Sequence, residues 1–288
     1  MVARLRGRLA PYALILPGGL WLLLFFVIPM VAMLSLSLQE GDIVNGYVLT
    51  WHWQTYVDAI SNYETQIVRS LWYGLITTVI QIVLAFPIAY YIAFKAGRNK
   101  STYLFILLLP FFVSFVLRTI SWRFMLTDEG MVLGPLKEWG LLDPQFHLLG
   151  TAPAVIAGLT YNFLPFMVLP IYVALERIDP RLMEAARDLY ASPVQVFRRV
   201  VFPLALPGVF AGVLMTFVPA SSDYVNSELL GSSSTTMIGQ VIQAQYLRSQ
   251  NYPTASALSF ALMALLLVGI FLYARILGTE DVLKVAAR

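Results

Sequence analysis

The chain has 288 residues with a net charge of +3; 59% of the residues are hydrophobic and only 12% are charged. A soluble domain carries roughly 25% charged residues, so the composition excludes an ordinary soluble domain and indicates an integral membrane protein. There is no cysteine, which excludes disulfides, thiolate metal sites and cysteine catalysis. His52 and His147 lie far apart in the sequence, so we expect no metal site.

Six apolar segments are long enough to be membrane spans, since crossing the hydrocarbon takes about 20 residues. The first follows the basic residues Arg4, Arg6 and Arg8, and it is longer than the apolar core of a cleaved signal peptide. We therefore expect this first segment to be retained. The sequence predicts an all-α membrane protein with six transmembrane helices and a single domain. The predicted spans cover residues 11–38, 70–94, 103–126, 148–175, 204–220 and 255–277.

The distribution of basic residues orients this arrangement. With the N-terminus in the cytoplasm, 14 of the 19 Lys and Arg residues fall on the cytoplasmic side of the predicted spans. Cytoplasmic loops of membrane proteins carry such an excess of positive charge. We therefore expect both termini to be cytoplasmic, together with the charged segment between the fourth and fifth spans. This topology explains the net positive charge better than nucleic-acid binding does.

A search for catalytic patterns finds none in this sequence. The chain has no Walker A pattern, so it does not hydrolyse ATP by itself. It also lacks the GxSxG and HExxH patterns and a pair of carboxylates within a span. We therefore expect no catalytic residues, no metal ligands and no cofactor in this chain, and an enzyme acting within the membrane is a poor hypothesis.

Polar residues inside or at the ends of spans are candidates for a substrate path, because burying them is costly. Arg118 either lines such a path or reaches the outer surface, where it would be structural. Asp223 beside Tyr224 would suit a cationic substrate, the alternative being a solvated acid or a helix cap. Asn162 needs a hydrogen-bond partner, either on another helix or in the path. The candidates are Arg118, Trp122, Tyr161, Asn162, Asp223 and Tyr224.

The segment between the fourth and fifth spans contains two helix starts. Asp179-Pro180 and Ser192-Pro193 each place a capping side chain before a proline at the first helical position. The periodicity predicts a short helix whose apolar face includes Leu182 and Leu189. A break near Tyr190 and a second short helix that runs into the fifth span follow.

This segment resembles the EAA loop of binding-protein-dependent ABC transporter permeases. The pattern of that family is Glu-Ala-Ala, three residues, Gly, nine residues and Ile-x-Leu-Pro, and Tyr190 departs from it by replacing the glycine. Other stretches, such as LPFFVSFVLRTISW and SELLG, are similar to the spermidine/putrescine permease branch. The residues that match the pattern are Glu184, Ala185, Ala186 and Pro203, with Val200 and Phe202 as conservative replacements.

The resemblance implies a permease subunit of the bacterial inner membrane that forms half of the pathway for a small solute, here a polyamine. A second homologous permease would form the other half, and an extracytoplasmic solute-binding protein would deliver the solute. A dimer of ATP-binding subunits would hold ATP and Mg and would receive a cytoplasmic two-helix coupling loop at about residues 177–203. The residues implied in coupling are Glu184, Ala185, Ala186, Asp188, Tyr190, Arg198 and Pro203.

Alternatives to this function remain open from the sequence. The same kind of importer would serve another solute, such as ferric iron, an opine, an amino-acid derivative or an anion. A channel or scaffold without an ATPase would need no EAA segment. The short helices would then simply lie on the membrane surface.

Tyr190 gives the resemblance a local test. A glycine at this position would end the first helix in a left-handed conformation. A tyrosine in that conformation costs about 1 kcal/mol. We expect the break between the helices to persist, with Tyr190 either at negative φ or in a strained conformation.

Overall fold

The computed structural model describes residues 15–276. The basic residues of both tails (Arg4, Arg6, Arg8, Lys284 and Arg288), on which the predicted orientation partly depends, lie outside these residues. The described residues divide into two compact units. The first contains residues 15–63 and 242–263, and the second contains residues 64–241 and 264–276.

The first unit begins with a long apolar helix and continues with a small hairpin. The helical stretch Ile15–Ser37 is apolar enough to cross a membrane, and none of its most apolar window is buried. It includes a π-helical turn, η1 (Leu23–Val27), which leads into α2 (Ile28–Ser37). The antiparallel strands β1 (Gln39–Asp42) and β2 (Gly46–Leu49) follow, and then α3 (Gln54–Asn62).

Hydrogen bonds tie the later segment of this unit to the hairpin and to α3. The Tyr47 hydroxyl donates to the Gln250 carbonyl oxygen at 2.7 Å. The Gln245 amide nitrogen Nε2 donates to the Tyr63 hydroxyl at 2.6 Å. The polar and aromatic residues that follow the first span are therefore held in place by hydrogen bonds to residues 245–250.

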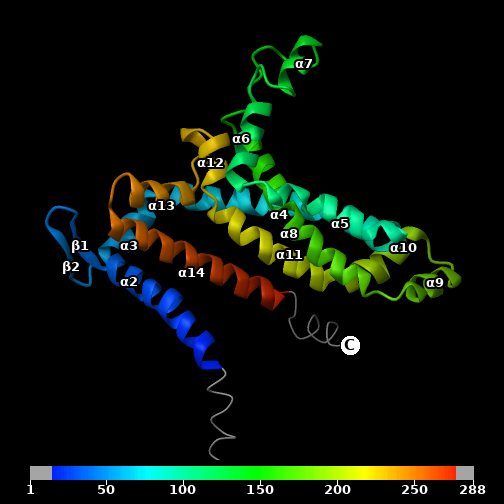
Figure 1. Cartoon of the computed structure of the whole chain (residues 1–288), viewed down its shortest axis with the longest axis horizontal. Helices are drawn as coiled ribbons and strands as arrows, with labels where there is room; N and C mark the ends of the chain where they lie inside the picture. Colours follow the sequence, from blue (N-terminus) through cyan, green and yellow to red (C-terminus); the bar gives the residue numbers. More distant parts are fainter. Residues whose placement is uncertain (1–14, 277–288) are drawn as a thin grey trace, which may run out of the picture. The chain divides into compact units, whose positions relative to one another are not determined.

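The second unit contains the larger helical bundle. Its long helices are α4, α8 and α11, which run side by side (Figure 1). The helices in chain order are α4 (Glu64–Phe94), η2 (Gly97–Asn99), α5 (Lys100–Leu108), η3 (Leu109–Phe112), α6 (Phe115–Met125), α7 (Leu133–Glu138), α8 (Ala152–Glu176), α9 (Pro180–Asp188), α10 (Pro193–Val196), η4 (Phe197–Val201), α11 (Phe202–Ser222), α12 (Val225–Leu230) and η5 (Ser233–Thr235). Two further helices, α13 (Ile238–Leu247) and α14 (Tyr252–Ile276), each belong partly to both units.

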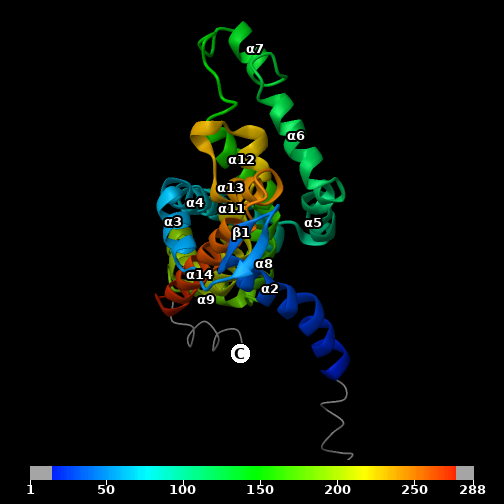
Figure 2. The ribbon, with the colours of Figure 1, turned by 90° about the vertical axis from the view of Figure 1, so that its left-hand side faces the viewer.

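The lengths and apolar composition of the helices agree with the predicted helical membrane protein. Within residues 15–276, five helices are long and apolar enough to cross a membrane, or up to six if one bent pair is a single span. That pair is residues 97–112 and 115–125, which meet at 90° (Figure 2). The predicted third span is therefore broken, because Val113 and Ser114 have extended backbone conformations between η3 and α6.

The loop after α6 is held together by a carboxylate. Asp128 accepts a hydrogen bond from Lys137 Nζ at 3.0 Å and lies 2.7 Å from His147 Nδ1. The hydrogen bonds with Lys137 and then with His147 lower the pKa of Asp128 below its ordinary value. The loop between α6 and α8 thus contains a local polar cluster around α7.

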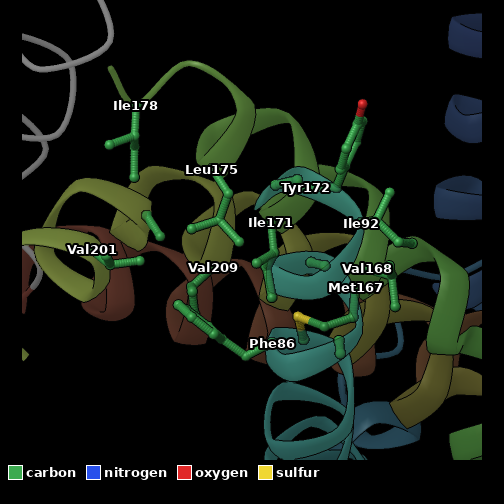
Figure 3. Packing of buried hydrophobic residues seen from close by; sticks show 14 of the residues in the cluster. Phe86, Ile92, Met167, Val168, Ile171, Tyr172, Leu175, Ile178, Val201 and Val209 are labelled. Atoms are coloured by element: carbon green, nitrogen blue, oxygen red, sulfur yellow. The ribbon is translucent and has the colours of Figure 1, made fainter. Parts of the chain in front are cut away.

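The hydrophobic core of the second unit lies between α4, α8 and α11 (Figure 3). Met167, Ile171 and Leu175 of α8 are fully buried there, where Phe86 of α4 and Val209 of α11 also contribute. Lipid is as apolar as these side chains, so tight packing and interhelical hydrogen bonds hold such a bundle together. One such interhelical hydrogen bond is donated by Gln81 Nε2 of α4 to the Thr160 carbonyl oxygen of α8 at 3.1 Å.

Small residues allow the helices to approach closely. A Cβ atom at Gly208 of α11 would lie 2.5 Å from the Pro170 carbonyl oxygen and 2.6 Å from the Ala174 Cβ atom of α8. Such contacts are too short for a real methyl group. The backbone of α8 therefore requires glycine at this point of α11.

The first prediction tests this packing. Gly208→Ala should lower the melting temperature of the purified protein in detergent, because an extra methyl group in a packed core costs about 1–3 kcal/mol. The matched control is Gly269→Ala in α14, where a Cβ atom would have nothing within 4 Å. Alanine is the better helix former, so the control should keep or raise the melting temperature. Equal effects of the two substitutions would contradict the packing.

Candidate functional site

The segment that resembles the EAA loop forms two short helices, as predicted. Asp179 precedes α9 and its Oδ1 atom accepts a hydrogen bond from the Arg181 backbone N–H at 3.0 Å. Ser192 precedes α10 and forms a capping box with Gln195. In that box the Ser192 N–H donates to Gln195 Oε1 at 2.8 Å, and the Gln195 N–H donates to Ser192 Oγ. The sequence signals for both helix starts are therefore confirmed.

The break between the helices has a defined geometry. Tyr190 has φ = 60°, which is the left-handed region, so the strained alternative of the prediction is the one observed. Its N–H donates to the Arg187 carbonyl oxygen at 2.8 Å, and the Ala191 N–H donates to the Ala186 carbonyl oxygen at 3.1 Å. This pair of bonds is the Schellman motif that glycine usually completes. The tyrosine thus takes the glycine conformation and keeps the break.

The second short helix is continuous with the fifth span. After α10 the backbone passes through one π-helical turn, η4, and then enters α11 without a break, so that residues 193–222 form one helical span. Pro203 lies in the first turn of α11, where its missing N–H disturbs the hydrogen-bond ladder. A π-turn is a common way of absorbing such a disturbance and is frequent at functional sites. The second short helix and the fifth span are therefore one continuous helical element.

One face of the segment, formed by Met183, Val196 and Val201, packs into the hydrophobic core. Met183 of α9, Val196 of α10 and Val201 of η4 are buried in the cluster formed with α4 and α8. The Phe86 ring of α4 lies edge-on to the Phe197 ring, with 5.3 Å between their centroids. The segment is therefore anchored to the bundle and is not a loose loop.

The opposite surface of the segment is unusually exposed. Leu189 is 82% exposed and Tyr190 is 97% exposed, and Leu182 and Val194 also lie on the surface. The predicted apolar face containing Leu182 and Leu189 is thus exposed and is not the face that packs on the core. Met183 is buried instead, because the core lies about a quarter-turn away from that face.

The residues expected to take part in coupling surround this exposed surface. The side chains of Glu184, Asp188 and Arg198 are exposed, and so are Ala185 and Pro203. Ala186 instead packs against the core cluster. An exposed carboxylate next to exposed apolar side chains is suited to docking against another protein.

The second group of candidates lies around α6. Arg118 is only 7% exposed, and its guanidinium carbon lies 4.4 Å from the centroid of the Phe111 ring. The same carbon is 5.8 Å from the Phe115 ring and 6.0 Å from the Tyr161 ring. Arg118 therefore does not reach out to the surface but is enclosed by aromatic faces.

Trp122 and Tyr161 lie beside this arginine. Their ring centroids are 5.3 Å apart. Both line an open, mostly apolar groove of about 550 Å³ between α4, α6 and α8, which Thr160 also lines. The Thr160 hydroxyl is buried and has no hydrogen-bond partner among the described residues. Tyr161 therefore both lines the groove and contacts Arg118.

Asn162 and Asp223 belong to one buried hydrogen-bond network. Asn162 Nδ2 donates to Thr119 Oγ1 and to Asn226 Oδ1, both at 3.0 Å. Asn226 donates through its backbone N–H to Asp223 Oδ1 at 2.7 Å, and Asp223 so caps the first turn of α12. Burial raises the pKa of the Asp223 carboxyl to about 6, while hydrogen bonds from Asn226 oppose the shift. The geometry gives both residues structural partners, and their role in a substrate path stays a prediction.

Five of the six path candidates are therefore grouped in two neighbouring clusters, and Tyr224 lies exposed after Asp223. Sequence reasoning missed Thr119 and Asn226, which connect the network, and two of the three rings that enclose Arg118, Phe111 and Phe115. Phe115 precedes Arg118 by three residues, the spacing of neighbours on one helix face, whereas Phe111 lies in η3 on the other side of the bend. The spacing of Phe115 was the available signal.

Comparison with known proteins identifies the family. Residues 65–278 match the family model of the binding-protein-dependent transport system inner membrane component. The chain belongs to this family. The match covers α4 to α14 and includes both groups of candidate residues, and it places the chain among multi-pass proteins of the inner membrane.

The similarity to curated relatives covers most of the chain. The spermidine/putrescine transport system permease protein PotB of Haemophilus influenzae is 35% identical over 88% of this chain and 90% of its own. PotB of Escherichia coli is 32% identical, over 88% of this chain and 93% of its own. The inner membrane ABC transporter permease protein YdcU of Escherichia coli is 34% identical over 77% of this chain and 74% of its own.

Solved structures of ABC transporter chains share the fold. A chain of a bacterial ABC transporter involved in the import of the acidic polysaccharide alginate aligns with a TM-score of 0.71 at 20% identity, covering 97% of this chain and 98% of that one. A chain of the MetNI methionine ABC transporter in an inward-facing conformation aligns with a TM-score of 0.52 at 20% identity, covering 77% of this chain and 94% of that one. At these identities the likeness concerns the fold alone.

The second prediction concerns Tyr190. Tyr190→Gly should keep the break and should not lower the melting temperature, because glycine adopts the left-handed conformation without the cost of about 1 kcal/mol. Tyr190→Pro should disrupt the break, because proline fixes φ near about −65° and lacks the N–H that donates to Arg187. Co-purification with an ATP-binding subunit would report the intact segment. A proline variant that assembles like the wild type would contradict the geometry.

Proposed function

We propose that the chain is the permease subunit of an ABC importer and forms half of the translocation pathway for a polyamine, with spermidine and putrescine as the substrates. Both termini and residues 177–203 lie in the cytoplasm in this proposal. The chain itself contributes no catalysis and holds no cofactor. ATP and Mg belong to a dimer of separate ATP-binding subunits.

The geometry of residues 177–203 carries this proposal. The underside of the segment is packed into the core, α10 continues into α11, and the opposite surface exposes Leu189, Tyr190 and the Glu184 carboxylate. A partner that closes on this surface would move a whole span rather than a flexible loop. This arrangement supports coupling of ATP hydrolysis in a partner to alternating access. A channel or scaffold without an ATPase has no use for it.

The substrate assignment comes from the relatives. Two relatives that match almost the full length of this chain are spermidine/putrescine permeases. The full importer would comprise this chain, a second homologous permease, the ATP-binding dimer and an extracytoplasmic solute-binding protein. The candidates for contact with the substrate are the aromatic residues Trp122 and Tyr161, the cluster around Arg118, and Asn162, Asp223 and Tyr224.

One observation favours a different solute in the same kind of importer. None of the ion pairs described within residues 15–276 includes Arg118, although this arginine is buried. A buried unpaired guanidinium would suit an anionic solute. An anion is therefore the second candidate substrate class.

The third prediction tests coupling. Glu184→Ala should reduce ATP-driven uptake by the reconstituted importer by about tenfold or more, since a hydrogen bond to a charged group contributes about 1.5–3 kcal/mol. The matched control is Glu129→Ala, which removes an exposed carboxylate from the loop between α6 and α7. It should leave both ATPase assembly and uptake unchanged. Uptake by Glu184→Ala at the wild-type rate would exclude a coupling role for this residue.

The fourth prediction tests the substrate. The solute-binding protein encoded with this permease should bind spermidine or putrescine in isothermal titration calorimetry. Anions and amino-acid derivatives, titrated in parallel, should give no heat of binding. A binding protein that ignores polyamines and binds an anion would remove the polyamine assignment and leave the importer intact.

A further inference from the structure

Arg118 is a buried cation that lies against the faces of three aromatic rings. Its Nε atom is buried without a hydrogen-bond partner among the described residues, and no ion pair described there includes it. A charged side chain within a membrane protein requires compensation, because burying an isolated charge is expensive. The compensation here comes from the faces of Phe111, Phe115 and Tyr161.

These three rings form an aromatic cage. The strongest contact is with Phe111, whose centroid lies 4.4 Å from the guanidinium carbon, and all three lie within 6.0 Å. A cation within about 6 Å of a ring face is attracted by the ring quadrupole, by about 0.5–2 kcal/mol. Cages of this kind also bind ammonium ligands. The chemistry that holds Arg118 is therefore the chemistry that would recognise an alkylammonium group.

The cage is assembled across the bend in the broken span. Phe111 lies in η3 before the 90° bend, Phe115 begins α6 after it, and Tyr161 comes from α8. A cation at the centre thus joins three separate elements. If the cage were emptied, the rings would lose their common partner, whereas exchange of one cation for another would keep them together.

The cage adjoins the groove through one side chain. Tyr161 contacts Arg118 on the cage side and lines the groove of about 550 Å³, where its ring is 5.3 Å from Trp122. An ammonium group in the groove would therefore contact the same Tyr161 ring that contacts Arg118. No carboxylate is needed for this step, which explains how a cationic solute could pass a site that contains an arginine.

We infer that Arg118 is an exchangeable occupant of an ammonium-binding cage. The guanidinium fills the cage in the absence of substrate, and an alkylammonium group of the solute replaces it during passage. Arg118 then acts as a specificity-determining residue, because neutral and anionic solutes cannot replace a cation among the rings. The inference rests on the proposed polyamine function and adds a site to it.

The test measures direct binding of radiolabelled spermidine to the purified complete importer in lipid nanodiscs, without the solute-binding protein. Arg118→Gln removes the competing cation and should tighten spermidine binding by about threefold to tenfold, in line with the strength of a cation–π contact. Arg118→Met should behave in the same way and serves if the glutamine variant assembles poorly. Arg118→Lys keeps a competing cation and should remain near the wild type.

A second substitution shows whether the gain depends on the cage. Phe111→Leu combined with Arg118→Gln should abolish the gain, because the closest ring is removed. A gain that persists without Phe111 would overturn the cage. No gain, or weaker binding, in both neutral variants would overturn the exchange and would indicate that Arg118 attracts an anionic group.

Spermidine uptake by the wild-type importer, measured with its binding protein in proteoliposomes, separates this inference from the proposed function. Uptake without any gain in the neutral variants overturns the exchange alone. A gain in the neutral variants without wild-type uptake overturns the polyamine substrate and leaves the cage in place.

Discussion

The rest of the second unit depends on the close approach of α8 to α4 and α11, because these three helices form its core. A membrane offers no hydrophobic driving force between helices, so backbone proximity and dense packing must supply the stability. Gly208 permits this proximity on α11, and the amide of Gln81 reaches the α8 backbone from α4. The three helices consequently form the packed centre of the second unit.

The two candidate regions use this packed centre in different ways. At residues 177–203 the buried side chains Met183 and Val201 extend the core directly into the exposed segment. Around α6 the core instead gives way to polar and aromatic contacts, where Asn162 joins α8 to Thr119 and to Asn226. The first region is the one proposed to couple to an ATPase. The second, with its polar network and its bent span, is the proposed substrate pathway.

Local signals in the sequence predicted the elements that depend on local physics. The apolar runs identified the spans, and a capping side chain before a proline identified the starts of α9 and α10. Proline was less informative about the bend. Pro87 and Pro165 lie inside unbroken helices, whereas the backbone after Pro110 becomes extended. Whether a proline breaks a span is decided by the tertiary contacts around it, and these are not visible in a single sequence.

The details of both sites depended on such tertiary contacts. Periodicity placed Leu182 and Leu189 on one apolar face, but burial depends on where the core lies, and Met183 is the residue that faces it. Likewise, Arg118 could be recognised as a costly residue without its partners being known. The family pattern supplied the position of Tyr190 but not its conformation, because a tyrosine can satisfy a turn in more than one way.

The left-handed tyrosine has a consequence for the evolution of the importer. Its ring makes almost no contact within its own chain, yet its backbone bears a conformational cost of about 1 kcal/mol that a glycine would avoid. In the importer proposed above, only a contact made after assembly with the ATP-binding subunit would offset this cost. On that proposal the permease and its ATPase are matched to each other at this point, and subunits exchanged between related importers would be least interchangeable at the tip of this turn.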